Sequence, residues 1–122
     1  MRRLFVILTL CTCVFLSLSA DDAAAINLQH QGHDGHYNFP VPADQPAVYY
    51  NNYTRTIIIE GGGEVNYYYV EIESQTTYDY VISTQVDGYY DTIDVSSVTE
   101  DQYRIIIYSP TGHIFEGYFT VY

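Results

Sequence analysis

The chain has 122 residues, of which 15 are acidic and only four are Lys or Arg, giving a formal net charge of −11 at pH 7. This charge disfavours binding to nucleic acid or to an anionic membrane, because both partners are themselves negative. Tyrosine is the other bias, with 15 copies. Tyrosine is favoured at half-buried positions of β-sheets, and the length fits a single domain.

The first 20 residues have the pattern of a secretory signal peptide. Two arginines follow the initial methionine, and an uncharged apolar run extends from residue 4 to residue 18. This run is too short for a comfortable transmembrane helix, which needs about 20 residues. Small residues offer three cleavage positions, after Ser19, Ala20 or Ala25. We therefore expect residues 1–20 to be removed and the protein to be secreted to the extracellular space; an uncleaved signal anchor is the alternative.

Both cysteines, Cys11 and Cys13, lie in this leader. The mature chain would therefore have no disulfide and no thiolate metal site, and its stability would come from packing. A cut after Ala20 would leave Arg55 and Arg104 as the only Lys or Arg residues against 15 acidic residues, a formal net charge of −13. Such a charge favours attraction to a cationic protein or peptide.

Residues 21–47 are predicted to form a mobile N-terminal tail, because they show no sustained hydrophobic period. Three prolines favour extended chain there: Pro40, Pro42 and Pro46. The tail also holds three evenly spaced histidines: His30, His33 and His36. Neutral imidazoles bind Zn²⁺ and Cu²⁺, but a mobile segment with intervening glycines does not hold them in place. We therefore expect no resident cofactor and at most weak, open binding of zinc or copper.

From residue 48 to residue 122 the pattern is that of short strands with turn signals about every 10 residues. A first strand is expected near Val48–Tyr53. The glycines at 61–63 are predicted to close a hairpin that pairs Ile59 with Val65 and Ile57 with Tyr67. The strand after this turn changes its apolar face partway, which predicts a bulge or a strand shared between two sheets.

Asp87-Gly88 predicts a second hairpin, with a two-residue type I′ turn. It would pair Val86 with Tyr89, Ile82 with Ile93 and Tyr80 with Val95. Those six side chains would form one buried face.

Pro110-Thr111-Gly112 predicts a third hairpin, in which Gly112 takes the left-handed position of the turn. It would pair Ser109 with His113, Ile107 with Phe115 and Tyr103 with Phe119. The buried face would consist of Tyr103, Ile105, Ile107, Phe115, Phe119 and Val121. On the opposite face, Arg104 would come near Glu116.

About seven short strands without a helix predict an all-β fold, a small antiparallel β-sandwich of immunoglobulin-like type without a disulfide, over residues 48–122. A partly open β-barrel is the alternative.

Two kinds of surface residue suggest roles outside the core. Asn52-Tyr53-Thr54 is an N-glycosylation sequon, so Asn52 is expected to carry a glycan in a secreted protein. Three acidic residues lie beside tyrosines and are candidates for binding a partner: Asp79, Asp91 and Asp101.

No catalytic motif is present. A Gly-x-Ser-x-Gly nucleophile turn is absent, and His113 is the only histidine between residues 48 and 122. The sequence therefore favours a secreted, non-enzymatic binding module that acts on a cationic protein or peptide through an acidic, tyrosine-rich surface. The alternative is a tyrosine-rich extracellular structural protein. Neither reading fixes the oligomeric state.

Overall fold

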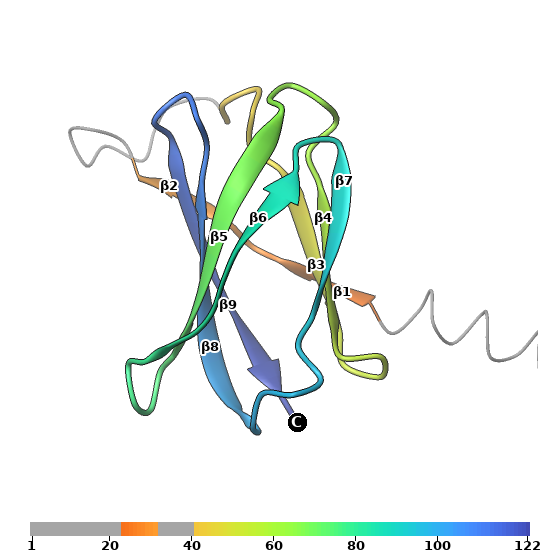
Figure 1. The fold of residues 1–122 in the computed structure, drawn as a ribbon, viewed down its shortest axis with the longest axis vertical. Helices are drawn as coiled ribbons and strands as arrows, with labels where there is room; N and C mark the ends of the chain where they lie inside the picture. The colour runs from red at the N-terminus through yellow and green to blue at the C-terminus, as the bar shows by residue number, and fades with distance from the viewer. Residues whose placement is uncertain (1–22, 32–40) are drawn as a thin grey trace, which may run out of the picture.

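The computed structural model describes residues 23–31 and 41–122, and all regular structure in this part of the chain is β (Figure 1). The strands are β1 (Ala23–Ile26), β2 (Gln29–Gln31), β3 (Ala47–Asn51), β4 (Thr56–Glu60), β5 (Tyr67–Ser74), β6 (Tyr80–Asp87), β7 (Tyr90–Asp94), β8 (Asp101–Tyr108) and β9 (Ile114–Val121). Within the described residues, no helix is long and apolar enough to cross a membrane.

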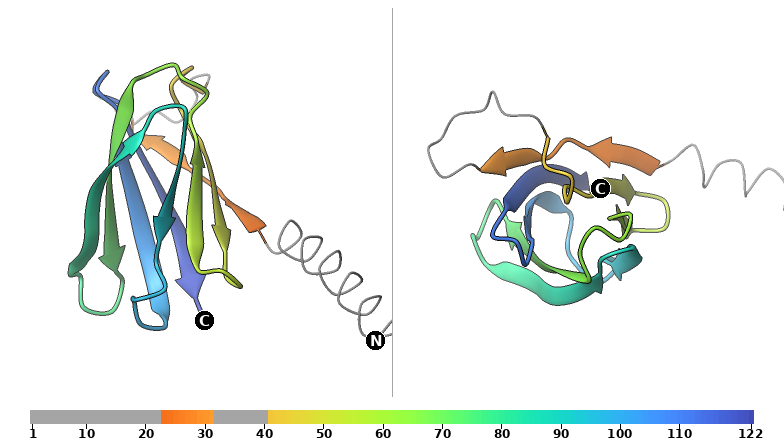
Figure 2. Two further views of the ribbon diagram at one scale, coloured as in Figure 1. Left: turned by 45° about the vertical axis from the view of Figure 1, so that its right-hand side comes forward. Right: turned by 90° about the horizontal axis from the view of Figure 1, so that it is seen from above.

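The strands form two antiparallel sheets that pack face to face (Figure 2). The four-stranded sheet has the order β1-β3-β4-β7, and the five-stranded sheet has the order β2-β9-β8-β5-β6. The predicted immunoglobulin-like β-sandwich is therefore confirmed. The strands from β3 onward are the seven that the sequence predicts, and β1 and β2 add one strand to each sheet.

The core lies between the sheets and is almost entirely apolar. Alternate residues of each strand face it, as the period of two in a strand requires. The five-stranded sheet contributes Tyr68, Val70, Ile72, Val86, Tyr103, Ile105, Ile107, Phe115, Phe119 and Val121, and the four-stranded sheet contributes Ile26, Val48, Tyr50, Ile57, Ile59 and Ile93. Two buried tyrosines keep their hydroxyls satisfied, because Tyr68 donates to the Asp44 carbonyl at 2.7 Å and Tyr103 to the Thr99 carbonyl at 2.6 Å.

The β8–β9 hairpin has the predicted register. Tyr103 pairs with Phe119 and Ile107 with Phe115. The Ser109 N–H donates to the His113 carbonyl at 2.9 Å across the turn. Gly112 has a φ of 96°, the left-handed conformation predicted for it, and all six side chains of the predicted inner face are buried.

The other two predicted hairpins are wrong, because both turns cross from one sheet to the other. β4 and β7 belong to the four-stranded sheet, whereas β5 and β6 belong to the five-stranded sheet. Neither Ile59–Val65 nor Ile82–Ile93 is a strand pair: Ile59 pairs with Asp91, and Ile82 pairs with Ile72. Four of the six residues expected on the second buried face do pack in or against the core, namely Ile82, Val86, Ile93 and Val95. Tyr80 and Tyr89 instead lie in solvent, 53% and 71% exposed.

The physical reason is that the two crossing turns bond to each other. The Gly61 N–H donates to the Tyr89 carbonyl at 3.0 Å, and the Gly63 N–H donates to the Gly88 carbonyl at 3.2 Å. A Cβ on Gly88 would lie 1.9 Å from the carbonyl oxygen of Val65. The glycines thus permit a backbone-to-backbone contact that a local hairpin would not need.

The change of apolar face predicted within β5 is wrong, because the strand is regular from Tyr67 to Ile72. Its pairing with β6 shifts register between Ile72 and Glu73, which marks a β-bulge or similar irregularity. Tyr68, Val70 and Ile72 all face the core, so the strand stays within one sheet.

The N-terminal segment corrects the prediction of a tail over residues 21–47. Residues 23–31 form β1 and β2, which pair with β3 and β9. We call residues 23–31 the strap, because they run obliquely from one sheet to the other (Figure 1). Gly117 makes room for this crossing, since a Cβ there would lie 2.6 Å from Cγ2 of Ile26 and 2.9 Å from the Asn27 carbonyl oxygen. The predicted signal peptide and residues 32–40 lie outside the described residues.

Candidate functional site

The outward surface of the five-stranded sheet is rich in tyrosines and carboxylates. Tyr68 and Val70 of β5 and Ile105 of β8 point into the core. Because side chains alternate along a strand, the residues next to them in sequence point outward. We define the tyrosine face as Tyr67, Tyr69, Glu71, Glu73, Tyr80, Arg104, Ile106, Tyr108, Glu116 and Tyr118, which are neighbours in the strand pairings.

Ile106 and Arg104 form the middle of this face. Ile106 points outward but is only 5% exposed, and its direct cross-strand neighbours are Glu71 and Glu116. Nη1 of Arg104 lies 3.4 Å from Oε2 of Glu116, as the sequence predicts, and its Nε lies 3.2 Å from Oε1 of Glu73. The contact with Glu73 is an ion pair whose geometry does not make a hydrogen bond. The single arginine is thus shared by two carboxylates.

Glu71 is the third carboxylate of the tyrosine face and has no cationic partner among the described residues. Beside it, Tyr69 and Tyr108 are cross-strand neighbours whose ring centroids lie 6.2 Å apart. Burial raises the pKa of Tyr108, and the negative charge of Glu71 raises it further. A carboxylate without a cation beside two tyrosine rings is suited to receive a cationic group, by charge and by cation–π contact.

A second polar cluster surrounds Asp44 at the turn between β8 and β9. The buried Asp44 carboxylate accepts hydrogen bonds from Oγ of Ser109 and Oγ1 of Thr111, both at 2.5 Å, and lies 2.8 Å from Nδ1 of His113. Burial alone would raise the pKa of Asp44, but the three hydrogen bonds and the charge of His113 outweigh it and place that pKa below its ordinary value of 3.8. The cluster ties the segment before β3 to the hairpin 65 residues further along the chain.

The Asp44 cluster has the residue types of a serine hydrolase but a different arrangement. Nucleophilic catalysis requires the serine hydroxyl to bond the imidazole, which then accepts its proton. Here the hydroxyls of Ser109 and Thr111 both donate to the carboxylate of Asp44. Oγ of Ser109 is therefore held by an acceptor that keeps its proton in place, and the cluster is organised as a structural tether.

The three histidines considered as candidates for weak metal binding are only partly within the described residues. His30 lies in β2, its ring centroid 5.0 Å from that of His113 and 5.5 Å from that of Phe115. Its Nε2 is buried and has no hydrogen-bond partner in the described part of the chain. His33 and His36 lie outside it. Residues 23–31 and 41–122 contain no group of three His, Cys, Asp or Glu placed to hold a metal ion.

The three acidic residues predicted to bind a partner do not form one surface. Asp79 is exposed in the β5–β6 turn, and Asp91 lies on β7 in the other sheet. Asp101, at the start of β8, accepts hydrogen bonds from Oγ of Ser74 at 2.6 Å and Oγ1 of Thr76 at 2.7 Å. These side-chain hydrogen bonds lower the pKa of Asp101. Its carboxylate is thus occupied in holding the β5–β6 turn.

Asn52 lies in the turn between β3 and β4. Its Oδ1 accepts a hydrogen bond from the Tyr50 hydroxyl at 3.0 Å and another from the Tyr122 N–H at 3.2 Å. The next residue of the sequon, Tyr53, is 61% exposed. The sequon is therefore at the surface, and its use stays a prediction.

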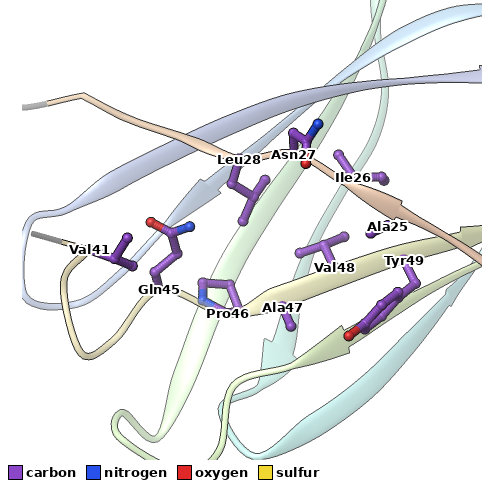
Figure 3. Close-up of a pocket in the computed structure, with 10 residues that line it drawn as sticks. All are labelled: Ala25, Ile26, Asn27, Leu28, Val41, Gln45, Pro46, Ala47, Val48 and Tyr49. Atoms are coloured by element: carbon purple, nitrogen blue, oxygen red, sulfur yellow. The ribbon is translucent and has the colours of Figure 1, made fainter. Parts of the chain in front are cut away.

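Among residues 23–31 and 41–122, two shallow grooves lie beside the sheets. One, of about 390 Å³, is bordered by the strap on one side and by the segment entering β3 on the other (Figure 3). Its lining residues include Leu28, Val41 and Pro46. The other, of about 400 Å³, lies between the edge strands β6 and β7 and includes Ile82, Val86, Asp91 and Asp94.

The sheets and their topology define the class of the protein, an immunoglobulin-like β-sandwich. A similar solved structure is that of a DUF3244 family protein from Bacteroides vulgatus with an immunoglobulin-like β-sandwich fold. It superposes with a TM-score of 0.64 at 16% sequence identity, over 82% of this chain and 99% of that one. At this identity the likeness concerns the fold alone. No family model and no curated protein matches the chain.

Proposed function

We propose that the chain is a secreted, non-enzymatic binding module that takes a cationic protein or peptide on its acidic, tyrosine-rich surface. The observation that supports this proposal best is Glu71, a carboxylate with no cation among the described residues, next to the ring pair Tyr69–Tyr108. The net charge, −13 after a cut following Ala20, would attract a cationic partner from a distance. The tyrosine rings would then hold its ammonium or guanidinium groups at short range.

A charge-matched pair of variants tests the proposal. Glu71→Gln removes the carboxylate from the tyrosine face, whereas Glu60→Gln makes the same change at an exposed position on β4 of the other sheet. Binding of a lysine-rich peptide, measured by calorimetry, should weaken about two- to fivefold in Glu71→Gln and much less in Glu60→Gln. Affinity should also fall as salt rises. Equal affinities of both variants, or equal affinity at low and high salt, would contradict the proposal.

The second candidate function, a structural protein cross-linked through tyrosine, is supported by the tyrosines in the turns and at the C-terminus. Tyr78, Tyr89 and Tyr122 are each more than two-thirds exposed and lie away from the core. Such rings are accessible to coupling with a neighbouring molecule. Dityrosine in the natural material, detected by its fluorescence after hydrolysis, would favour this function over the binding module.

A further inference from the structure

We infer that β6 is an open sheet edge that binds an extended cationic peptide segment as an added antiparallel strand. This inference rests on the proposed function and names the way in which the partner is held. Of the four edge strands, β1, β2 and β7 have four, three and five residues, whereas β6 has eight. Proteins usually protect long edges with charges, prolines or bulges. β6 has no lysine or proline, and its only charged residue is Asp87, at its end. Its one irregularity is at the opposite end, where Val81 has no partner on β5, so the pairing from Ile82 to Asp87 is regular.

The direction of the β6 backbone groups follows from its pairing with β5. Gly88 donates its N–H to the Asn66 carbonyl, so even-numbered residues of β6 bond to β5 in the regular part of the ladder. The N–H and C=O groups of Ser83 and Gln85 therefore point away from the sheet. The next N–H of β6 that points away from the sheet is that of Asp87, and it already donates to Oδ2 of Asp91 at 2.8 Å. The open part of the edge thus ends at Gln85.

The side chains around this edge favour a cationic occupant. Ser83 lies directly opposite Glu71, and Gln85 lies opposite Tyr69. A lysine on an added strand beside Ser83 would extend over this short side chain to Glu71. On the inner side, the groove between β6 and β7 has a mixed lining, in which the apolar side chains of Ile82, Val86 and Ile93 lie among polar ones. It carries the carboxylates of Asp91 and Asp94 and has no basic residue in its lining. A second copy of the chain would bring another acidic edge to the same place, so charge favours a basic peptide.

The geometry also predicts which residue types suit alternate positions of the peptide. In antiparallel addition, a residue whose amide bonds to Ser83 or Gln85 has its side chain on the same side as the tyrosine face. These positions suit lysine or arginine. The alternate positions face the groove walls at Ile82 and Val86, and they suit valine or another apolar residue.

Two methylated probe peptides test this arrangement on the whole chain. The parent probe is a seven-residue peptide of alternating lysine and valine. N-methylation of the lysine amides removes the donors that face β6, whereas N-methylation of the valine amides leaves them intact and keeps the same charge. The lysine-methylated probe should bind about 30-fold more weakly than the valine-methylated one, for two lost hydrogen bonds of ordinary strength. The Ser83 and Gln85 amides should also exchange hydrogen more slowly when the valine-methylated probe is bound.

The outcomes separate this inference from the proposed function. Equal affinity of the two methylated probes, with unprotected Ser83 and Gln85 amides, would overturn strand addition; the proposed function would still stand if Glu71→Gln weakened both probes. No binding of either probe would overturn both. A concentration-dependent dimer in sedimentation, abolished by Gln85→Pro, would assign the edge to a second copy and overturn the peptide inference. Proline is tolerated at this position because the Gln85 N–H makes no bond to β5.

Discussion

Two glycines show how differently the two kinds of turn in this sandwich are built. Gly112 closes the β8–β9 hairpin within one sheet, with a φ of 96° and nothing within 4 Å of where its Cβ would be. Gly88 lies in the crossing from β6 to β7, and its Cβ would overlap the backbone of Val65. One position needs glycine for its conformation, and the other needs it for space. The hairpin is also tethered by Asp44, whereas the crossing is held by backbone bonds to the other crossing turn.

The largest expected effect is on the free energy of unfolding, and it should differ between the strand that leads into the hairpin turn and the strand that leads into the crossing. Ile107 on β8 is fully buried, whereas Ile82 on β6 is only partly buried against the core. Ile107→Ala should lower the free energy of unfolding by about 2–5 kcal/mol, through lost burial and a cavity, and Ile82→Ala should cost about half as much. Urea unfolding measures both. A larger loss at Ile82 would mean that the core is centred nearer to the crossing turn than the structure places it.

Substitution of the two glycines should have the next largest effect on the free energy of unfolding. Gly88→Ala should cost about 3 kcal/mol, because the new methyl group meets backbone that has to move. Gly112→Ala should cost about 1 kcal/mol, since the methyl group has room and only the left-handed conformation is unfavourable. Thermal unfolding of the two variants beside the unmodified chain measures this difference. Equal losses would contradict the distinction between space and conformation.

The tether on the β8–β9 turn predicts a pH dependence. Because the folded pKa of Asp44 lies below its ordinary value of 3.8, the ionised carboxylate stabilises the fold above the unfolded pKa. That stabilisation is lost as the pH falls through the folded pKa. Asp44→Asn should therefore be about 1–2 kcal/mol less stable near neutral pH, and the difference should shrink below about pH 4. A difference that stays constant down to pH 2 would show that the charge of Asp44 contributes nothing.

The smallest effect on stability is expected at the β3–β4 turn, which stays within one sheet. Oδ1 of Asn51 accepts the N–H groups of Tyr53 and Thr54, so this turn is held mainly by the residue before the sequon. Asn52→Gln should change the free energy of unfolding by less than about 1 kcal/mol. In a eukaryotic host it should also abolish the gel shift that a glycosidase produces. Identical bands for both proteins, with and without glycosidase, would show that Asn52 carries no glycan.

The difference between a turn within one sheet and a turn that crosses between sheets also explains which parts of the fold are predictable from sequence. Both arms of the β8–β9 hairpin alternate, and Pro110 and Gly112 specify their turn, so local rules gave the register. Asp87-Gly88 has an equally strong hairpin signal, but the choice between closing a hairpin and crossing to another sheet depends on Gly61 and Val65, which are distant in sequence. The strands of the strap are not predictable from local sequence, for a similar reason. Ala23–Ile26 has little intrinsic preference for a strand and becomes one by pairing with β3.

The sequence predicts what kind of surface the candidate site has, but not which residues form it. Composition indicates an acidic, tyrosine-bearing surface, and acid–tyrosine neighbours along the chain led to Asp79, Asp91 and Asp101. Residues on one face of a sheet are neighbours across strands. Glu71 and Tyr108 lie close together although they are 37 positions apart in the sequence, and only the pairing of β5 with β8 shows this. The alternation in β5 contains a usable signal, because Tyr67, Tyr69 and Glu71 occupy every second position beside an apolar inner row.

If the chain is secreted as proposed, the place at which its leader is cut has a consequence for the strap. A peptidase that cut after Ser19 or Ala20 would leave β1 whole. One that cut after Ala25 would remove three of its four residues and leave only Ile26 opposite Val48. The backbone of β3 would then become the border of its sheet, with unpaired groups of the kind that recruit other strands. In a protein secreted as proposed, the choice between Ala20 and Ala25 would thus decide whether this sheet has four strands or three.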